Sequence, residues 1–323
     1  MTEADGWTEV QRLATQVIWQ TATNLGSRLS PLNLAAMLLL CLVIWRVRRP
    51  AVSFLAWAFP ARVYRNPSFG LDVKLYLFNF ALSVLVVVNN TAITTLAAGA
   101  FGAVSGAAPP VPGVGSALLA ALVMFLAADF VGYWYHRINH DWRWLWPVHA
   151  LHHSAELLNP VTAYRHHPLY LLLATPLNAV TTGVAQAVLL VFITGSLDLY
   201  LLAGTNFFYA VFNLFASNLR HSHIWLRYPR AVEHILISPA QHQCHHSIDP
   251  RHHNRNYGEV LALWDWIFGT LYLPSRDEII RFGLGDANGC PLPQPHPTLG
   301  SALIVPLRDA GRALRKGVVQ EGD

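Results

Sequence analysis

The stretch LLAALVMFLAADFVGYWYHRINHDWRWLWPVHALHH, residues 118–153, decides the fold. Residues 118–136 contain a single charged side chain, Asp129, and are apolar enough for a membrane-spanning helix. The stretch ends in two histidine patterns, HRINH at residues 136–140 and HALHH at residues 149–153. On a helix, residues three and four positions apart share one face, so each pattern presents its imidazoles together. The stretch therefore predicts a membrane helix that leads into a histidine-rich site.

The composition of the whole chain agrees with a membrane protein. Of its 323 residues 53% are hydrophobic and only 12% are charged, and the mean hydropathy is +0.33. This excludes a disordered chain, which needs low hydrophobicity and high charge. The formal net charge of +4 is too small to indicate nucleic-acid binding, and three scattered cysteines predict no disulfide framework.

Uncharged stretches outside the quoted segment predict further membrane spans. The longest, Leu75–Ala128, is interrupted by GAAPPVPG at residues 106–113, and such a cluster of Pro and Gly breaks helices. We therefore expect five spans in all, drawn from Leu29–Trp45, the two halves of Leu75–Ala128, Pro168–Leu197 and Leu199–Leu219. The expected fold class is all-α: a multi-pass transmembrane helical bundle with a cytoplasmic, histidine-rich helical cap that holds a dinuclear metal site.

The basic residues set the expected orientation. Arginines and the single lysine of the loops follow the first, third and fifth spans, whereas the Pro-rich loop and the turn at Asp198 have none. Positive loops face the cytoplasm, so the active site is expected on the cytoplasmic side of what we take to be a bacterial inner membrane. We divide the chain into an N-terminal interfacial segment (1–28), two spans with their loops (29–117), a catalytic domain (118–274) and a cytoplasmic tail (275–323).

Fifteen of the 16 histidines lie between His136 and His253, and a third cluster, HQCHH, occupies residues 242–246. Imidazole is a good ligand for iron, zinc and copper. Eight clustered imidazoles exceed the four ligands of one structural zinc, so two metal ions are expected. The Glu-x-x-His pairs of carboxylate-bridged di-iron bundles are absent from the predicted helices.

These motifs resemble the fatty acid hydroxylase and sterol desaturase superfamily of membrane di-iron oxygenases. The resemblance rests on HRINH, HALHH and HQCHH, with support from Asn256-Tyr-Gly258 and LWDWIFGT at residues 263–270, and covers about residues 118–274. Bacterial members and the alkylglycerol monooxygenase branch look most similar. The resemblance implies that the metal ligands are His136, His140, His149, His152, His153, His221, His242, His245 and His246.

Some positions keep alternative roles. His221 is preferred as the ninth ligand over His223, which stands where family members often have Asn. His167 matches a family position as a ligand or as a partner of one. A ligating imidazole donates its other N–H to an acceptor, which makes Asp129, Glu156, Asp249 and Asp265 candidate partners, although each could instead cap a helix or pair with an arginine.

The resemblance implies an O2-dependent lipid hydroxylase or desaturase that contains two irons and acts on a sterol, a fatty acyl group, an ether lipid or an aminolipid. A glycine fingerprint for flavin or nicotinamide is absent from the sequence, so electrons are expected from a separate reductase, ferredoxin or pterin. A membrane zinc hydrolase and a metal transporter are the alternatives. The hydrolase normally adds a glutamate base in HExxH, which does not occur here, and a transporter places its ligands near the bilayer midplane. The oligomeric state is open.

Overall fold

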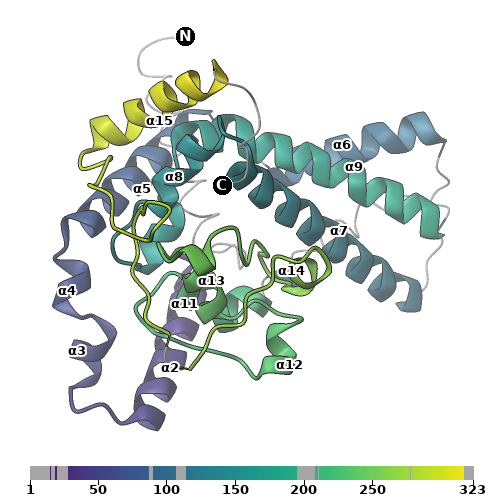
Figure 1. Ribbon diagram of the computed structural model, residues 1–323. Coiled ribbons are helices and arrows are strands. Elements are labelled where there is room, and N and C mark those ends of the chain that lie inside the picture. Colours follow the sequence, from purple (N-terminus) through teal and green to yellow (C-terminus); the bar gives the residue numbers. More distant parts are fainter. Residues whose placement is uncertain are drawn as a thin grey trace.

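The computed structural model describes residues 15, 19, 28–86, 90–106, 114–194, 208–209, 211–276 and 278–315. Within these residues the chain is helical, and the only β-structure consists of isolated bridges (Figure 1). The longer helices are α2 (Pro31–Arg48), α5 (Pro67–Val86), α6 (Asn90–Ser105), α7 (Val114–Asp141), α8 (Trp146–His153), α9 (Thr175–Thr194) and α15 (Leu299–Leu314). The shorter ones are α3 (Phe54–Ala58), α4 (Ala61–Tyr64), α11 (Asn218–Arg220), α12 (Arg230–Glu233), α13 (Pro239–His245) and α14 (Leu263–Ile267). Single turns of 3-10 or π helix complete the set: η1 (Pro160–Tyr164), η2 (Tyr170–Ala174), η3 (Asn213–Ser217) and η4 (Pro250–His252).

Within the described part of the chain, three helical segments are long and apolar enough to cross a membrane. They are Pro31–Arg48, Leu119–Asp141 and Tyr170–Ile193, of 18, 23 and 24 residues, and the apolar helix Ala92–Ser105 is shorter. At a rise of about 1.5 Å per residue, the three segments match the hydrocarbon thickness of a bilayer. The structure thus confirms an all-helical fold with helices that can span a membrane.

The second predicted span does not have the expected form. Helix α5 begins at Pro67, before the predicted start at Leu75, and carries Asp72 and Lys74 in its first half. The stretch that the sequence treats as one span is divided between α5 and α6. In the fifth predicted span, Leu199–Leu219, residues 199–207 and 210 lie outside the described residues, as does most of the N-terminal interfacial segment.

Helices α6, α7 and α9 pack side by side (Figure 1). Their contact buries Ala98, Met124, Ala187 and Leu190. A Cβ on Gly183 of α9 would lie only 2.3 Å from the backbone oxygen of Thr94 on α6, so only glycine permits this approach. Close helix contacts at small residues are typical of membrane proteins. This packing fixes α7, which carries the first histidine pattern.

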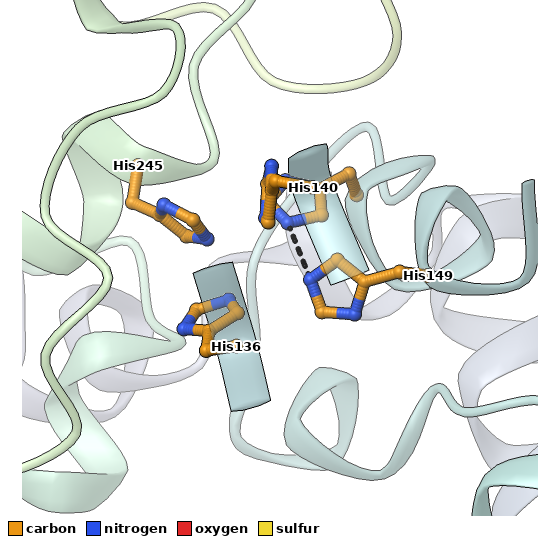
Figure 2. A group of neighbouring side chains, drawn as sticks. His136, His140, His149 and His245 are labelled. Atoms are coloured by element: carbon orange, nitrogen blue, oxygen red, sulfur yellow. Dashed lines mark hydrogen bonds between the residues drawn. The ribbon is translucent and has the colours of Figure 1, made fainter. Parts of the chain in front are cut away.

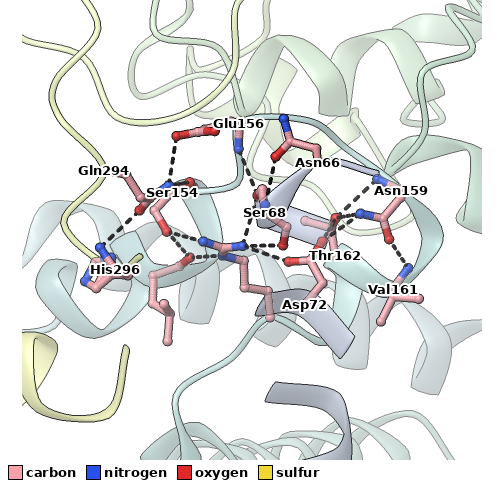
Figure 3. A network of polar contacts seen from close by, with 12 residues as sticks. Asn66, Ser68, Asp72, Ser154, Glu156, Asn159, Val161, Thr162, Gln294 and His296 are labelled. Carbon is pink, nitrogen blue, oxygen red and sulfur yellow. Dashed lines mark hydrogen bonds and ion pairs between the residues drawn. The ribbon is translucent and has the colours of Figure 1, made fainter. Parts of the chain in front are cut away.

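A buried polar network ties α5 to the end of α8 (Figure 3). The Arg165 side chain is fully buried and lies 2.8 Å from the Asp72 carboxylate. Asn159 and Thr162 donate to the same carboxylate, at 2.6 and 2.7 Å. The guanidinium also donates to the Leu151 carbonyl oxygen of α8. The network therefore holds the helix that carries the second histidine pattern.

Helix α15, which lies in the segment that the sequence assigns to a tail, packs against α8 and α5. Its Ala302 joins a buried cluster with Leu71, Leu75 and Leu151. A capping box between Thr298 and Ser301 starts the helix. Helix α15 thus packs against the helix that carries the second histidine pattern.

Candidate metal centre

Three helices and one turn supply nine histidines to a single buried region. His136 and His140 occupy the last turns of α7. His149, His152 and His153 belong to α8, and His221 follows α11. Helix α13 starts at a capping box between Ser238 and Gln241 with Pro239 at its first position, which fixes its register and the placement of HQCHH. That pattern supplies the remaining three histidines, His242, His245 and His246.

The first group of potential ligands contains five of these histidines: His136, His140, His149, His153 and His245. One ring nitrogen of each lies within 4.8 Å of the corresponding nitrogen of every other. Figure 2 shows the rings of His136 and His140 from α7 close to those of His149 from α8 and His245 from α13. The closest measured contact joins the Nε2 atoms of His149 and His153, which lie 3.2 Å apart.

The second group contains His152, His221, His242 and His246, all buried. The His221 Nε2 lies 3.2 Å from those of His152 and His246 and 3.1 Å from that of His242. The two groups adjoin, because His152 and His153 are consecutive and the rings of His153 and His246 stack with centroids 4.5 Å apart. The arrangement therefore offers two neighbouring sites rather than one.

The residues of both groups fit transition-metal ions. Ligands bound at about 2.0–2.1 Å in tetrahedral or octahedral geometry are separated by about 2.9–3.4 Å, a range that includes the distances in the second group. A neutral imidazole has one N–H, so four converging nitrogens cannot satisfy one another by hydrogen bonding. Among the described residues, the buried Nε2 atoms of His140 and His245 have no hydrogen-bond partner. Buried acceptors without partners are costly, and a metal ion would satisfy them.

The imidazoles are held in the neutral form that binds metals. Burial lowers the pKa of His149, His152, His153, His221, His242, His245 and His246, and the neighbouring charged forms lower it further. For His246 the pKa falls to about 3. A neutral imidazole has a free lone pair at ordinary pH, whereas an imidazolium does not.

Backbone carbonyls orient two histidines of the first group, His136 and His245. The Tyr257 carbonyl lies 2.8 Å from Nδ1 of His136, and the Arg255 carbonyl lies 2.8 Å from Nδ1 of His245. Each contact places the N–H on Nδ1 and leaves Nε2 for a metal. Such partners fix the tautomer and the ring orientation of a ligating histidine. Both carbonyls come from the loop that precedes α14.

Asp265 of α14 organises this loop. Its buried carboxylate accepts from the backbone N–H groups of Tyr257 and Gly258, both at 2.8 Å, and from the Thr270 hydroxyl at 2.6 Å. A Cβ on Gly258 would lie 2.9 Å from the carboxylate and 2.3 Å from the Leu261 carbonyl, so glycine is required there. Asp265 therefore acts on His136 through the loop and not by direct contact.

Asp129 of α7 binds the next residues of the same loop. Its carboxylate accepts from the N–H groups of Val260 and Leu261, both at 3.1 Å, and from the Trp264 indole at 3.0 Å. It connects α7 to the loop and to α14, and the structure gives it no contact with a histidine of either group. The sequence made Asp129 a candidate partner of a ligating histidine. Its partners instead lie more than a hundred residues later in the chain.

The other candidates lie outside both groups. His167 Nε2 lies 2.9 Å from the Leu303 carbonyl of α15, and His223 Nε2 lies 2.8 Å from the Trp57 carbonyl. Of His221 and His223, the structure thus brings only His221 into the second group. Glu156 is exposed and its backbone N–H donates to Ser68, and Asp249 caps η4 and pairs with Arg251.

A cavity of about 400 Å³ opens beside both groups, and sequence reasoning did not identify it. His136 and His149 line it from the first group, and His152, His221 and His242 from the second. His166 also lines it and stacks between the rings of His152 and Tyr170, with centroids 4.7 and 4.3 Å away. The sequence offers no signal for this placement beyond a histidine that adjoins His167.

The geometry of the histidine groups agrees with the similarity of the sequence to known proteins. Residues 121–270 match the model of the fatty acid hydroxylase family. This part of the chain belongs to that family. Over 163 residues, half of this chain, it is 32% identical to the alkylglycerol monooxygenase of Homo sapiens, of which the match covers 32%.

Two other relatives extend the comparison. The alkylglycerol monooxygenase of Danio rerio is 30% identical over 172 residues, half of this chain and 32% of the relative. The ornithine lipid hydroxylase OlsE of Rhizobium tropici is 29% identical over 157 residues, 49% of this chain and 43% of the relative. The matches thus span less than half the length of these relatives. The search of solved structures finds no significant match.

Proposed function

We propose that the chain is an integral-membrane, non-haem di-iron oxygenase that hydroxylates or desaturates an unactivated C–H bond of a membrane lipid. The observation that carries the proposal is the pair of adjoining all-imidazole groups beside one cavity. The first iron would be held by His136, His140, His149, His153 and His245, and the second by His152, His221, His242 and His246. The family and the names of its relatives support a lipid oxidation.

Bound iron supplies the O2 and redox chemistry, and the chain supplies the surroundings. In hydroxylation one oxygen atom enters the C–H bond and the other leaves as water, which consumes two electrons and two protons. The loop carbonyls of Tyr257 and Arg255 hold two ligands in one tautomer. Burial of eight of the nine histidines limits the access of bulk water, which protects a reactive centre from side reactions.

The electrons would come from a separate protein or a pterin, as the sequence leads us to expect. We place the site on the cytoplasmic side of a bacterial inner membrane, with residues 118–274 as the catalytic domain. Residues 1–28, 29–117 and 275–323 would then be its interfacial, membrane and tail segments. Neither ligand group includes a carboxylate, whereas the zinc hydrolase alternative normally places the glutamate of HExxH between two of its ligands.

The test is isotopic. Membranes that contain the full chain, supplied with ¹⁸O2 and a reducing system, should yield lipids that carry one ¹⁸O atom, or lipids that have lost two hydrogens. The variants His245→Ala and His242→Ala, one from each group, should abolish the product. His234→Ala is the matched control, because its Nδ1 contacts the Arg230 carbonyl outside both groups. A product that persists in both variants would refute the proposal.

A further inference from the structure

Most of the side chains that line the cavity beside the histidine groups carry a polar atom, although carbon atoms of their rings and stems also form part of its surface. Of its fifteen lining residues only Ala163 and Gly258 lack a side-chain nitrogen or oxygen. A channel for an acyl tail would need aliphatic or phenylalanine side chains, since apolar ligands are bound by apolar walls. Besides the histidines, the wall contains two arginines, one glutamate, one asparagine and three tyrosines. The group that reaches the histidines from this cavity is therefore a polar one.

Arg220 supplies a buried cation with unused hydrogen-bonding capacity. Its side chain is 3% exposed, and its guanidinium donates to the Glu259 backbone carbonyl and lies over the Phe212 ring. Its Nε–H, also buried, has no partner among the described residues. Arg28 lines the same cavity. Two like charges that converge on one cavity favour an anion between them.

Glu259 supplies the opposite charge. Its carboxylate packs against Gly132 of α7, where a Cβ would lie 3.4 Å from the Oε2 atom. Among the described residues the carboxylate has neither an ion pair nor a hydrogen bond, because Arg220 contacts the backbone carbonyl of Glu259 instead. A half-buried carboxylate beside two arginines that it does not pair with is available to a cation.

We propose that this cavity binds the zwitterionic headgroup of the lipid that the centre oxidises. Arg28 and Arg220 would take its anionic group, a phosphate or a carboxylate, and Glu259 would take its ammonium group. The bond that is oxidised would then lie in the headgroup or the adjoining backbone of the lipid rather than deep in an acyl tail. The position of the oxidised bond rests on the proposed function, whereas headgroup binding does not.

Lipid competition measures the binding without turnover. The full chain is reconstituted in nanodiscs of phosphatidylethanolamine, phosphatidylglycerol and diacylglycerol in equal parts with the same acyl chains. It is then extracted in mild detergent, and the retained lipids are quantified by mass spectrometry. Phosphatidylethanolamine, which has both charges, should be retained about tenfold or more over diacylglycerol, since hydrogen bonds to charged groups are worth about 1.5–3 kcal/mol.

Two variants separate the two charges. Glu259→Gln should remove the preference for phosphatidylethanolamine over phosphatidylglycerol. Arg28→Gln should lower retention of both phospholipids relative to diacylglycerol. Glu156→Gln and Arg230→Gln are matched controls, because both residues are exposed and neither lines the cavity. The variants spare the most buried residue, Arg220, and metal content reports whether each one keeps its folded centre.

The outcomes are distinct. Equal retention of diacylglycerol and phosphatidylethanolamine, or a preference that Glu259→Gln leaves unchanged, would overturn the headgroup proposal. If the isotope experiment still gave an oxidised lipid, the oxygenase proposal would stand alone. Conversely, if the protein retained phosphatidylethanolamine in a charge-dependent way but formed no oxidised product, the headgroup proposal would stand and the oxygenase proposal would be refuted.

Discussion

Helix α8 takes part in two buried polar regions that differ in one respect. At its end, Arg165 donates to the carbonyl of Leu151 and the hydroxyl of Ser154, and it also pairs with Asp72 (Figure 3). Along its length, His149, His152 and His153 join the two histidine groups. In the first region every nitrogen of the guanidinium has an acceptor. In the second, buried ring nitrogens have no partner among the described residues.

The difference separates a structural network from a functional one. Buried polar groups in folded proteins are nearly always hydrogen-bonded, so a satisfied network needs no further explanation. A cluster that cannot satisfy its own hydrogen-bonding groups needs a partner from outside, and we propose that metal ions are that partner. The comparison predicts that substitutions in the histidine groups abolish activity but leave the protein folded. Substitutions in the Arg165 network should instead unfold the protein.

The largest effect is expected from the ligands themselves. His153→Ala should abolish lipid oxidation and lower bound metal, because it removes a nitrogen from the first group. The metal-free protein should unfold at an unchanged or higher temperature, since one buried polar group without a full set of partners is gone. Metal analysis and thermal unfolding of the apo and metal-loaded forms measure this. A large loss of apo stability would place His153 with the structural network.

Arg165→Met should lower the stability of the protein and leave its metal content unchanged. It leaves the Asp72 carboxylate buried without its cation, which costs about 3–5 kcal/mol when one partner of a buried pair is removed. The free energy of unfolding should fall by that amount, while the fraction that stays folded keeps its full metal content per chain. Denaturant unfolding in detergent provides the measurement, and Arg308→Met, which alters an exposed pair on α15, is the matched control. Metal loss from protein that is still folded would contradict the separation.

Asp265→Asn tests the loop that orients His136. The amide keeps the shape but loses one acceptor for the N–H groups of Tyr257 and Gly258, so the Tyr257 carbonyl should shift. Metal affinity should fall about 10- to 100-fold, as is usual for residues that orient a ligand. Chelator competition reports the affinity, with Asp249→Asn as the control because that carboxylate caps η4. Equal affinity in the two variants would remove Asp265 from the centre.

Acid should destabilise the metal-free protein through the same histidines. Their pKa values are lowered in the folded state, so the unfolded chain takes up protons first, below about pH 6.5. For His246 the loss runs from pH 6.5 down to about 3, at about 1.4 kcal/mol per pH unit. Unfolding temperatures of apo protein between pH 8 and pH 5 should therefore fall with pH, and less steeply in His246→Ala. Parallel profiles would show that His246 is not buried in neutral form.

Short sequence patterns predicted the local part of the centre. HRINH, HALHH and HQCHH each fall on a helix, because spacings of three and four residues fix a common face regardless of the rest of the fold. The choice between His221 and His223 depends instead on where the chain turns after α11. That turn is set by contacts such as the bond between His223 and Trp57, 166 positions away.

Long-range placement could not be predicted. Asp129 and Asp265 bind a loop through its backbone N–H groups, which leave no mark in the sequence. Arg220 and Glu259 look like ordinary charged residues until the fold sets both at one cavity. The start of α5 was also missed, because Asp72 looks like a limit to an apolar span and becomes tolerable only through Arg165.

Metal content per chain tests the central claim most directly. Full chain purified in detergent from iron-supplemented cells is analysed for all transition metals, together with His245→Ala and His242→Ala. We predict about two ions per chain in the wild type, mainly iron, and a loss of metal from each variant, because each alters a different group. One ion or none in the wild type, or variants that keep the full content, would contradict a dinuclear centre built from these histidines.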